Sequence, residues 1–204
     1  MSTMEKWKLI LRQSVALLAL ILLACHEARY SGDGKLTDDR FSPSQRFLLA
    51  LGRIDMSRAG VRTFRLADLP TRDFAIGIQV SGPRPANEPL YDSRPISPVV
   101  RITLTDETGR IVIDESRALN EWVWSGSPHE STSFVYLQGL SRDVPISNGV
   151  VSPQLIGVKS DAGWGTSFTP RHDGSYLLRV EILDGDQRAQ KYAIELRGVT
   201  GGWE

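Results

Sequence analysis

Apolar residues alternate with polar or small ones along much of this sequence, and this period of two restricts the fold more than any other feature. The alternation is clearest over 74–80, 99–105 and 175–183. Such alternation is typical of strands that bury one face. Further strands are expected near 47–55, 61–66, 119–124, 133–138 and 154–159. No segment after residue 25 has a convincing helical period, so the sequence predicts an all-β fold.

Turn residues separate two pairs of these strands. The sequence Thr-Asp-Glu-Thr-Gly-Arg at 105–110 predicts a hairpin over 99–114. Asp, Gly and Gln residues after 175–183 turn the chain into a second alternating run at 191–197. The sequence therefore predicts a final hairpin from these two runs.

The final pair of strands begins with Asp173-Gly174-Ser175-Tyr176. A Gly-x-Tyr at the start of the penultimate strand resembles the tyrosine corner of immunoglobulin-like β-sandwiches. Many bacterial extracytoplasmic β-sandwich modules share this Asp-Gly-x-Tyr lead into a last hairpin. The resemblance implies a single immunoglobulin-like sandwich, in which the Tyr176 ring packs inward and its hydroxyl bonds a nearby backbone group. The Cys…Trp…Cys signature of antibody domains is absent.

The first 24 residues have the pattern of a secretory signal. Lys6, Lys8 and Arg12 supply a positive start, and nine consecutive apolar residues follow over 15–23. A run of nine is too short to cross the roughly 30 Å hydrocarbon core, which needs about 20 residues. These features predict that 1–24 is a cleaved signal peptide and not an uncleaved membrane anchor.

The leader ends in Leu22-Leu23-Ala24-Cys25, which resembles the lipobox of bacterial lipoproteins. The family has an aliphatic residue three positions before the cysteine, a small residue directly before it, and a diacylglyceryl group on its sulfur. The resemblance implies a lipid anchor at Cys25, and His26 in place of aspartate implies sorting to the outer membrane. The alternative is an ordinary signal peptide with an accidental cysteine, which would need a small-x-small cleavage site that the chain lacks. A thioether would also remove the liability of a lone thiol in an oxidising compartment.

The segment 25–45 predicts a flexible linker, because it has no apolar periodicity and is rich in Gly, Ser and Asp. Twenty flexible residues span about 25 Å, enough to lift a domain clear of lipid headgroups. Five prolines lie between residues 83 and 98. Proline cannot donate to a strand ladder, so 81–98 is expected to be a loop within one domain. Residues 46–204 are therefore expected to form a single β-sandwich.

Composition and motifs argue against several functions. The 24 Lys and Arg residues balance 24 Asp and Glu residues, so no overall basic field attracts nucleic acid. One cysteine, three scattered histidines and the lack of a nucleophile elbow or glycine-rich phosphate loop predict no metal, no cofactor and no enzyme. Ser127 and His129 lie close in sequence but fit a turn. The carboxylate pairs are expected at turns and strand ends: Asp38/Asp39, Asp106/Glu107, Asp114/Glu115 and Asp184/Asp186.

Three tryptophans are the candidates for ligand binding, namely Trp122, Trp124 and Trp164. Trp122 and Trp124 flank one residue, so on a strand both indoles face the same side. Exposed, they would form a stacking platform of the kind that sugar-binding modules use. Turned inward, they would be core, which is the favoured interpretation because a sandwich of this size needs large core residues. Trp164 lies between glycines in a loop, either as a contact residue or folded back onto the sandwich.

The function expected from the sequence is that of a non-enzymatic lipoprotein of the cell envelope. Its sandwich would bind a protein partner, as accessory or immunity-type proteins do, and its membrane contact would be the lipid anchor. The alternative is a carbohydrate- or peptidoglycan-binding module that uses exposed tryptophans. A third hypothesis, an enzyme with an unrecognised site, would require a cleft that gathers polar groups such as His129, Glu130 and Asp143.

Overall fold

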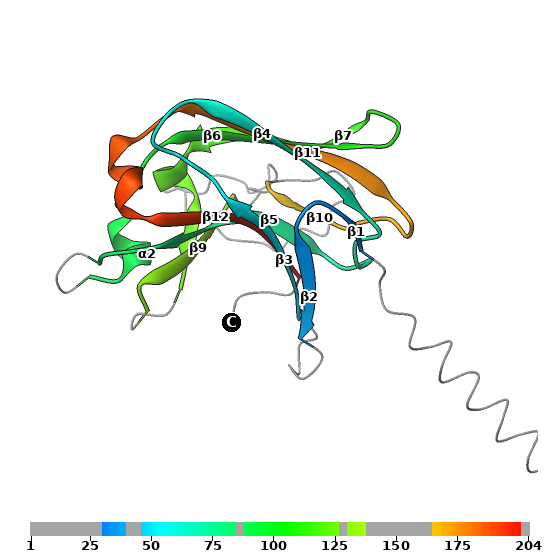
Figure 1. The fold of residues 1–204 in the computed structure, drawn as a ribbon, viewed down its shortest axis with the longest axis horizontal. Coiled ribbons are helices and arrows are strands. Elements are labelled where there is room, and N and C mark those ends of the chain that lie inside the picture. Colours follow the sequence, from blue (N-terminus) through cyan, green and yellow to red (C-terminus); the bar gives the residue numbers. More distant parts are fainter. Residues whose placement is uncertain (1–29, 40–45, 85–87, 127–129, 138–164, 201–204) are drawn as a thin grey trace, which may run out of the picture.

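The two main layers of this protein are antiparallel β-sheets. A computed structural model describes residues 30–39, 46–84, 88–126, 130–137 and 165–200. Figure 1 shows the two sheets stacked face to face, with one sheet above the other. The prediction of an all-β fold is confirmed.

Sheet A, the upper layer of Figure 1, has five strands in the order β1-β4-β11-β6-β7. They are β1 (Ser31–Gly32), β4 (Gly60–Ala67), β6 (Val99–Asp106), β7 (Ile111–Ala118) and β11 (Ser175–Asp184). Sheet B has seven strands in the order β2-β3-β12-β5-β9-β8, with β10 also beside β5. They are β2 (Lys35–Asp39), β3 (Arg46–Arg53), β5 (Phe74–Ser81), β8 (Val123–Ser125), β9 (Thr132–Tyr136), β10 (Ser167–Phe168) and β12 (Ala193–Thr200).

The core lies between the sheets and is built from the alternating runs. Buried residues alternate with less buried ones along β6 and along β11 from Tyr176 to Ile182. In β5 the alternate residues Phe74, Ile76, Ile78 and Val80 are buried. The central members are Val100, Ile102, Leu104, Leu178, Val180, Ile76, Ile78 and Val80. Each such side chain contributes about 1.5–3 kcal/mol when it leaves water. The period of two therefore decides which face of each strand is buried.

The first predicted hairpin is confirmed and the last one is wrong. β6 pairs with β7 as expected. β11 pairs with β4 and β6 in sheet A, whereas β12 pairs with β3 and β5 in sheet B. The turn between them is a 3₁₀ helix, η2 (Gln187–Lys191), capped by the Asp186 side chain, which also accepts a bond from the Ser97 N–H at 2.8 Å. This connection carries the chain from one layer to the other, so the hairpin that the immunoglobulin-like resemblance implied is not formed.

The prediction of a flexible linker over 25–45 is wrong for residues 31–39. β1 pairs with β4 in sheet A, and β2 pairs with β3 in sheet B, so this segment joins the two layers. Its glycines allow the backbone to pass close to the neighbouring strands. Gly34 has a φ of 87°, and a Cβ there would lie 2.4 Å from the Ala50 carbonyl oxygen. The Gly-rich composition therefore reflects tight packing and not flexibility.

The remaining expectations concern shorter segments. Of the strand predicted at 119–124, the first part is a 3₁₀ helix, η1 (Leu119–Glu121), and β8 starts at Val123. The proline-rich segment 81–98 is a loop with one short helix, α2 (Leu90–Ser93), in its described part. The strand predicted at 154–159 lies outside the described residues.

Candidate functional site

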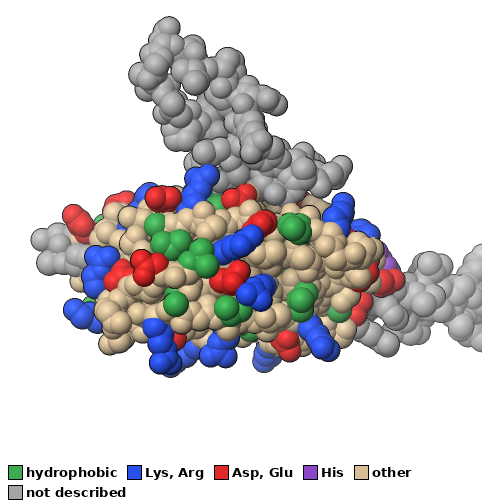
Figure 2. Space-filling view, turned by 90° about the horizontal axis from the view of Figure 1, so that it is seen from above, with side chains coloured by type: hydrophobic (Ala, Val, Ile, Leu, Met, Phe, Trp, Pro, Cys, Tyr) green, Lys and Arg blue, Asp and Glu red, His purple; other side chains and the backbone are tan. Residues whose placement is uncertain are grey.

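The outer face of sheet A carries the exposed apolar side chains of the described residues. Four large hydrophobic side chains are between 45% and 59% exposed, and all belong to sheet A: Val61, Ile111, Leu177 and Leu183. Figure 2 looks down on this face and shows hydrophobic side chains scattered among charged ones of both signs. Single exposed apolar residues are common on protein surfaces, and what distinguishes this face is that it carries all four of the large ones among the described residues.

Two ion pairs fix the charges in the middle of this face. Arg101 forms a two-pronged contact with Asp114, at 2.7 Å from Nε and 2.8 Å from Nη2. Arg179 contacts Glu181 at 2.8 Å. The hydrogen bond from Arg101 lowers the pKa of Asp114, and the one from Arg179 lowers the pKa of Glu181. Both carboxylates are therefore ionised at neutral pH and already have a partner.

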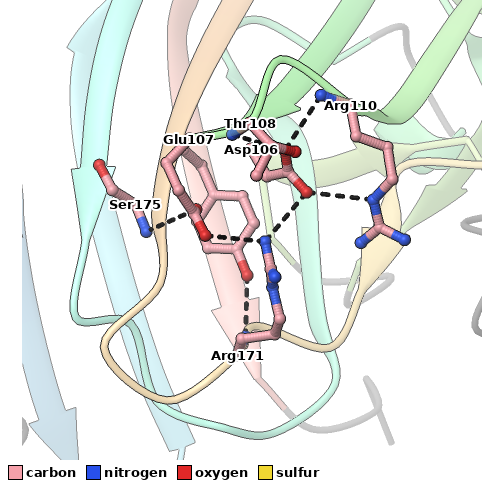
Figure 3. Close-up of polar contacts among 7 residues, drawn as sticks. Asp106, Glu107, Thr108, Arg110, Arg171 and Ser175 are labelled. Carbon is pink, nitrogen blue, oxygen red and sulfur yellow. Dashed lines mark hydrogen bonds and ion pairs between the residues drawn. The ribbon is translucent and has the colours of Figure 1, made fainter.

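The corner of sheet A at the β6–β7 turn holds Asp106, the one charged residue among the buried polar residues of the described structure (Figure 3). The Asp106 side chain is only 1% exposed. Its carboxylate accepts bonds from the N–H and hydroxyl of Thr108, at 3.0 and 2.5 Å. It also accepts two bonds from Arg110, both at 3.0 Å, and one from a guanidinium nitrogen of Arg171 at 2.9 Å. Five donors thus converge on one carboxylate.

These donors keep Asp106 ionised. The hydroxyl bond from Thr108, with the bonds from Arg110, lowers the pKa of Asp106 to about 2 against the opposing effect of desolvation. A carboxyl group with this pKa is a poor proton acceptor at neutral pH, and its oxygens are already engaged. The cluster stabilises a turn and has no chemistry to offer a substrate.

The tyrosine that the sequence singled out completes this corner. The Tyr176 ring is buried between the layers, and its hydroxyl accepts a bond from the Arg171 backbone N–H at 2.8 Å. This is the bond that the tyrosine-corner resemblance implied. Arg171 also contacts Glu107 at 3.0 Å, so the loop before β11 is held to the β6–β7 turn by one side chain (Figure 3).

The two tryptophan candidates that the structure describes are buried, as the favoured interpretation of the sequence expected. Trp122 is 1% exposed and Trp124 is 6% exposed, so neither offers a ring face to a ligand and the stacking platform is wrong for both. The Trp124 N–H donates to the Leu119 carbonyl at 2.9 Å, whereas the Trp122 N–H has no partner among the described residues. The third candidate, Trp164, lies outside the described residues, as does Cys25.

Most of the other polar candidates, namely Ser127, His129 and Asp143, lie outside the described segments. Glu130 is described and exposed, and His172 is exposed and contacts Asp173 at 2.7 Å. Within those segments, no three His, Cys, Asp or Glu side chains gather as metal ligands. Sequence reasoning missed the Asp106 cluster because Arg171 follows 65 residues later, and only the Asp-x-Thr turn signal was local.

The helices of the structure and comparisons with known proteins give two further findings. In the part of the chain that the structure describes, no helix is both long enough and apolar enough to cross a membrane. No model of a known protein family matches the chain, and no curated protein matches it significantly.

Proposed function

We propose that this chain is a lipid-anchored, non-enzymatic protein of the cell envelope whose β domain binds a protein partner. The observation that carries the anchor is the sequence Leu22-Leu23-Ala24-Cys25 directly after a nine-residue apolar run. It is supported by the fact that Cys25 is the only cysteine in 204 residues. Two or three acyl chains hold a protein firmly on a membrane, whereas one chain binds marginally.

The position of β1 shortens the tether that such an anchor would have. β1 starts at Ser31, six residues after Cys25. Six residues reach at most about 21 Å when fully extended. The β1 end of the domain would therefore stay near the headgroups, in contrast to the freely raised domain that a linker over 25–45 would give.

The outer face of sheet A supports the protein-binding role. Its exposed Val61, Ile111 and Leu177 supply apolar contacts, while the paired Arg101 and Asp114 keep the local charge balanced. Such a face suits another protein surface better than a small molecule, which needs a concave site. Burial of Trp122 and Trp124 removes two of the three residues on which glycan binding depended, and no observation favours that alternative.

Metabolic labelling with an alkynyl fatty acid tests the anchor. Wild-type protein should take up the label and sediment with membranes, because the acyl chains are attached at Cys25. The Cys25→Ser variant should take up no label, and Ser14→Ala, a matched change inside the leader, should label like wild type. Wild-type protein that is unlabelled and released in soluble form would refute the anchor.

A further inference from the structure

One long margin of sheet A is incompletely paired. β11 pairs with β4 along its whole length, from Gly60 to Ala67. On the other side of β4, β1 pairs only with Leu66 and Ala67. Figure 1 shows β1 as a short strand beside one end of β4. Among the described residues, five positions of β4, 60–64, have no strand on this side.

The bonds of Arg65 show which backbone groups point outward. The Asp33 N–H donates to the Arg65 carbonyl at 2.8 Å, and the Asp33 carboxylate accepts from the Arg65 N–H at 2.7 Å. Backbone groups of alternate residues point to the same edge of an antiparallel strand. The N–H and C=O groups of Thr63 and Val61 therefore point outward too, and no described residue bonds them.

The side chains on this edge are basic and unpaired. β4 contains Arg62 and Arg65 and no acidic residue. Both arginines are exposed, and neither side chain has a carboxylate partner among the described residues. Arg65 lies on the outer face of sheet A, where Arg101 and Arg179 are both paired, whereas Arg62 lies opposite Val180 and points to the other side of the strand. The positive charge of β4 is therefore available to an incoming group.

This charge argues against a second copy of the chain as the occupant. Two β4 strands paired about a two-fold axis would bring four arginines together along one seam, two from each copy. Like charges gathered across a strand pair are destabilising. An acidic strand would instead gain main-chain bonds at Val61 and Thr63 and ion pairs with the arginines.

We propose that the open edge of β4 from Gly60 to Phe64, beside Arg65, binds an extended acidic segment of a partner protein as an added strand. The proposal rests on the protein-binding role above and specifies the segment that is bound; it does not depend on the lipid anchor. Acidic residues on the outer face of the added strand would lie near Arg65, and acidic residues on its other face would lie near Arg62, because the two arginines point to opposite sides of β4.

The test uses the full chain in detergent at low salt, with two blocked nine-residue peptides as probes. One peptide alternates Glu and Val, and the other alternates Lys and Val. The acidic peptide should bind at least about tenfold more tightly, because only it is opposite in charge to β4. It should also slow amide exchange of Val61 and Thr63 by about tenfold or more, because these N–H groups become bonded.

Three variants locate the effect. Arg62→Glu should weaken binding of the acidic peptide several-fold, whereas Arg117→Glu, a matched change on the opposite margin strand β7, should not. Thr63→Pro removes one outward N–H and should abolish binding while both arginines remain, since an edge strand tolerates proline where the N–H faces solvent. Circular dichroism would verify that each variant is folded.

Three results would overturn the proposal: equal binding of the two peptides, exchange protection elsewhere than β4, or sedimentation of the peptide-free chain as a β4-dependent dimer. Other results would show separately whether the proposed function itself fails. A photo-crosslinker at Leu177 that captures one specific envelope protein would keep the protein-binding role even when the peptides fail to protect Val61 and Thr63. Loss of fatty-acid labelling would remove the anchor and leave the edge site standing.

Discussion

The Asp106 corner and the edge of β4 are both margins of sheet A, but they treat polar groups in opposite ways. At the corner, five donors meet one buried carboxylate. At the edge, the backbone groups of Val61 and Thr63 and two guanidinium groups have no partner among the described residues. A saturated buried cluster can only contribute stability, whereas unsatisfied exposed groups can contribute binding. Mutations should therefore separate the two properties.

The largest expected effect is on stability at the corner. Asp106→Ala removes the common acceptor of Thr108, Arg110 and Arg171, which together tie the β6–β7 turn to the loop before β11. Hydrogen bonds to a charged group contribute about 1.5–3 kcal/mol each, so Tm should fall by on the order of 10 °C. Calorimetry measures this. Asp92→Ala, on an exposed residue of α2, is the control that should leave Tm nearly unchanged, and a fall of under about 3 °C for Asp106→Ala would contradict the comparison.

The second largest effect is expected on the stability of the segment from Ser31 to Gly34, which contains β1 and closes one end of the open edge of β4. Gly34→Ala forces a side chain into a position with φ 87° and a contact of 2.4 Å to the Ala50 carbonyl. Strain of this kind costs about 1–3 kcal/mol, so stability should fall and β1 should loosen from β4. Amide exchange of Arg65 reports the loosening. Gly60→Ala is the matched control, because a Cβ at Gly60 meets nothing within 4 Å, and equal effects of the two changes would restore the linker interpretation of 25–45.

Acid should weaken the corner before it affects the edge. The hydroxyl bond from Thr108 lowers the pKa of Asp106 to about 2, and the bond from Arg188 likewise lowers the pKa of Asp186 to about 2. An aspartate in the unfolded chain has a pKa of about 3.9. The stability that these carboxylates add is present above about pH 4 and is lost as the pH falls toward about 2.

The Asp106→Asn variant isolates the share of this acid effect that belongs to the corner. Thermal unfolding of the wild type and the variant at pH 7, 4 and 2.5 should show the two Tm values converging as the pH falls. Parallel curves would mean that the Asp106 carboxylate does not titrate with folding. Because Asp186 remains in both proteins, its contribution cancels in the difference.

The sequence predicted what local patterns determine. Alternation placed the buried faces of β5, β6 and β11, and Asp173 to Tyr176 predicted a bond that spans only five residues, from Arg171 to Tyr176. One partner of Asp106, Arg171, lies 65 residues away, and no pattern within the turn points to it. Pairing over such a separation depends on the tertiary fold.

The wrong predictions concern segments whose composition is compatible with more than one backbone geometry. Glycine permits both flexibility and close approach, so Ser31 to Gly34 could be interpreted as a linker although it joins two sheets. A turn rich in Asp and Gly similarly suits a hairpin or a change of layer, and β11 and β12 use the second option. For the candidate site, the favoured interpretation of Trp122 and Trp124 as core residues is confirmed by their burial. The sequence left the exposed alternative open because their spacing puts both indoles on one side but does not say which side is covered.

The smallest effect is expected for the exposed ion pair of the sheet A face. Arg101→Gln removes a two-pronged contact with Asp114, yet both side chains are more than a third exposed. Exposed pairs contribute little because water and salt screen them, so Tm should change by no more than about 2 °C. Arg62→Gln, which breaks no ion pair, should change it even less. A large loss in either variant, measured in the same calorimetric series as Asp106→Ala, would show that exposed charges also hold this sheet together and that the corner is not distinct from the edge.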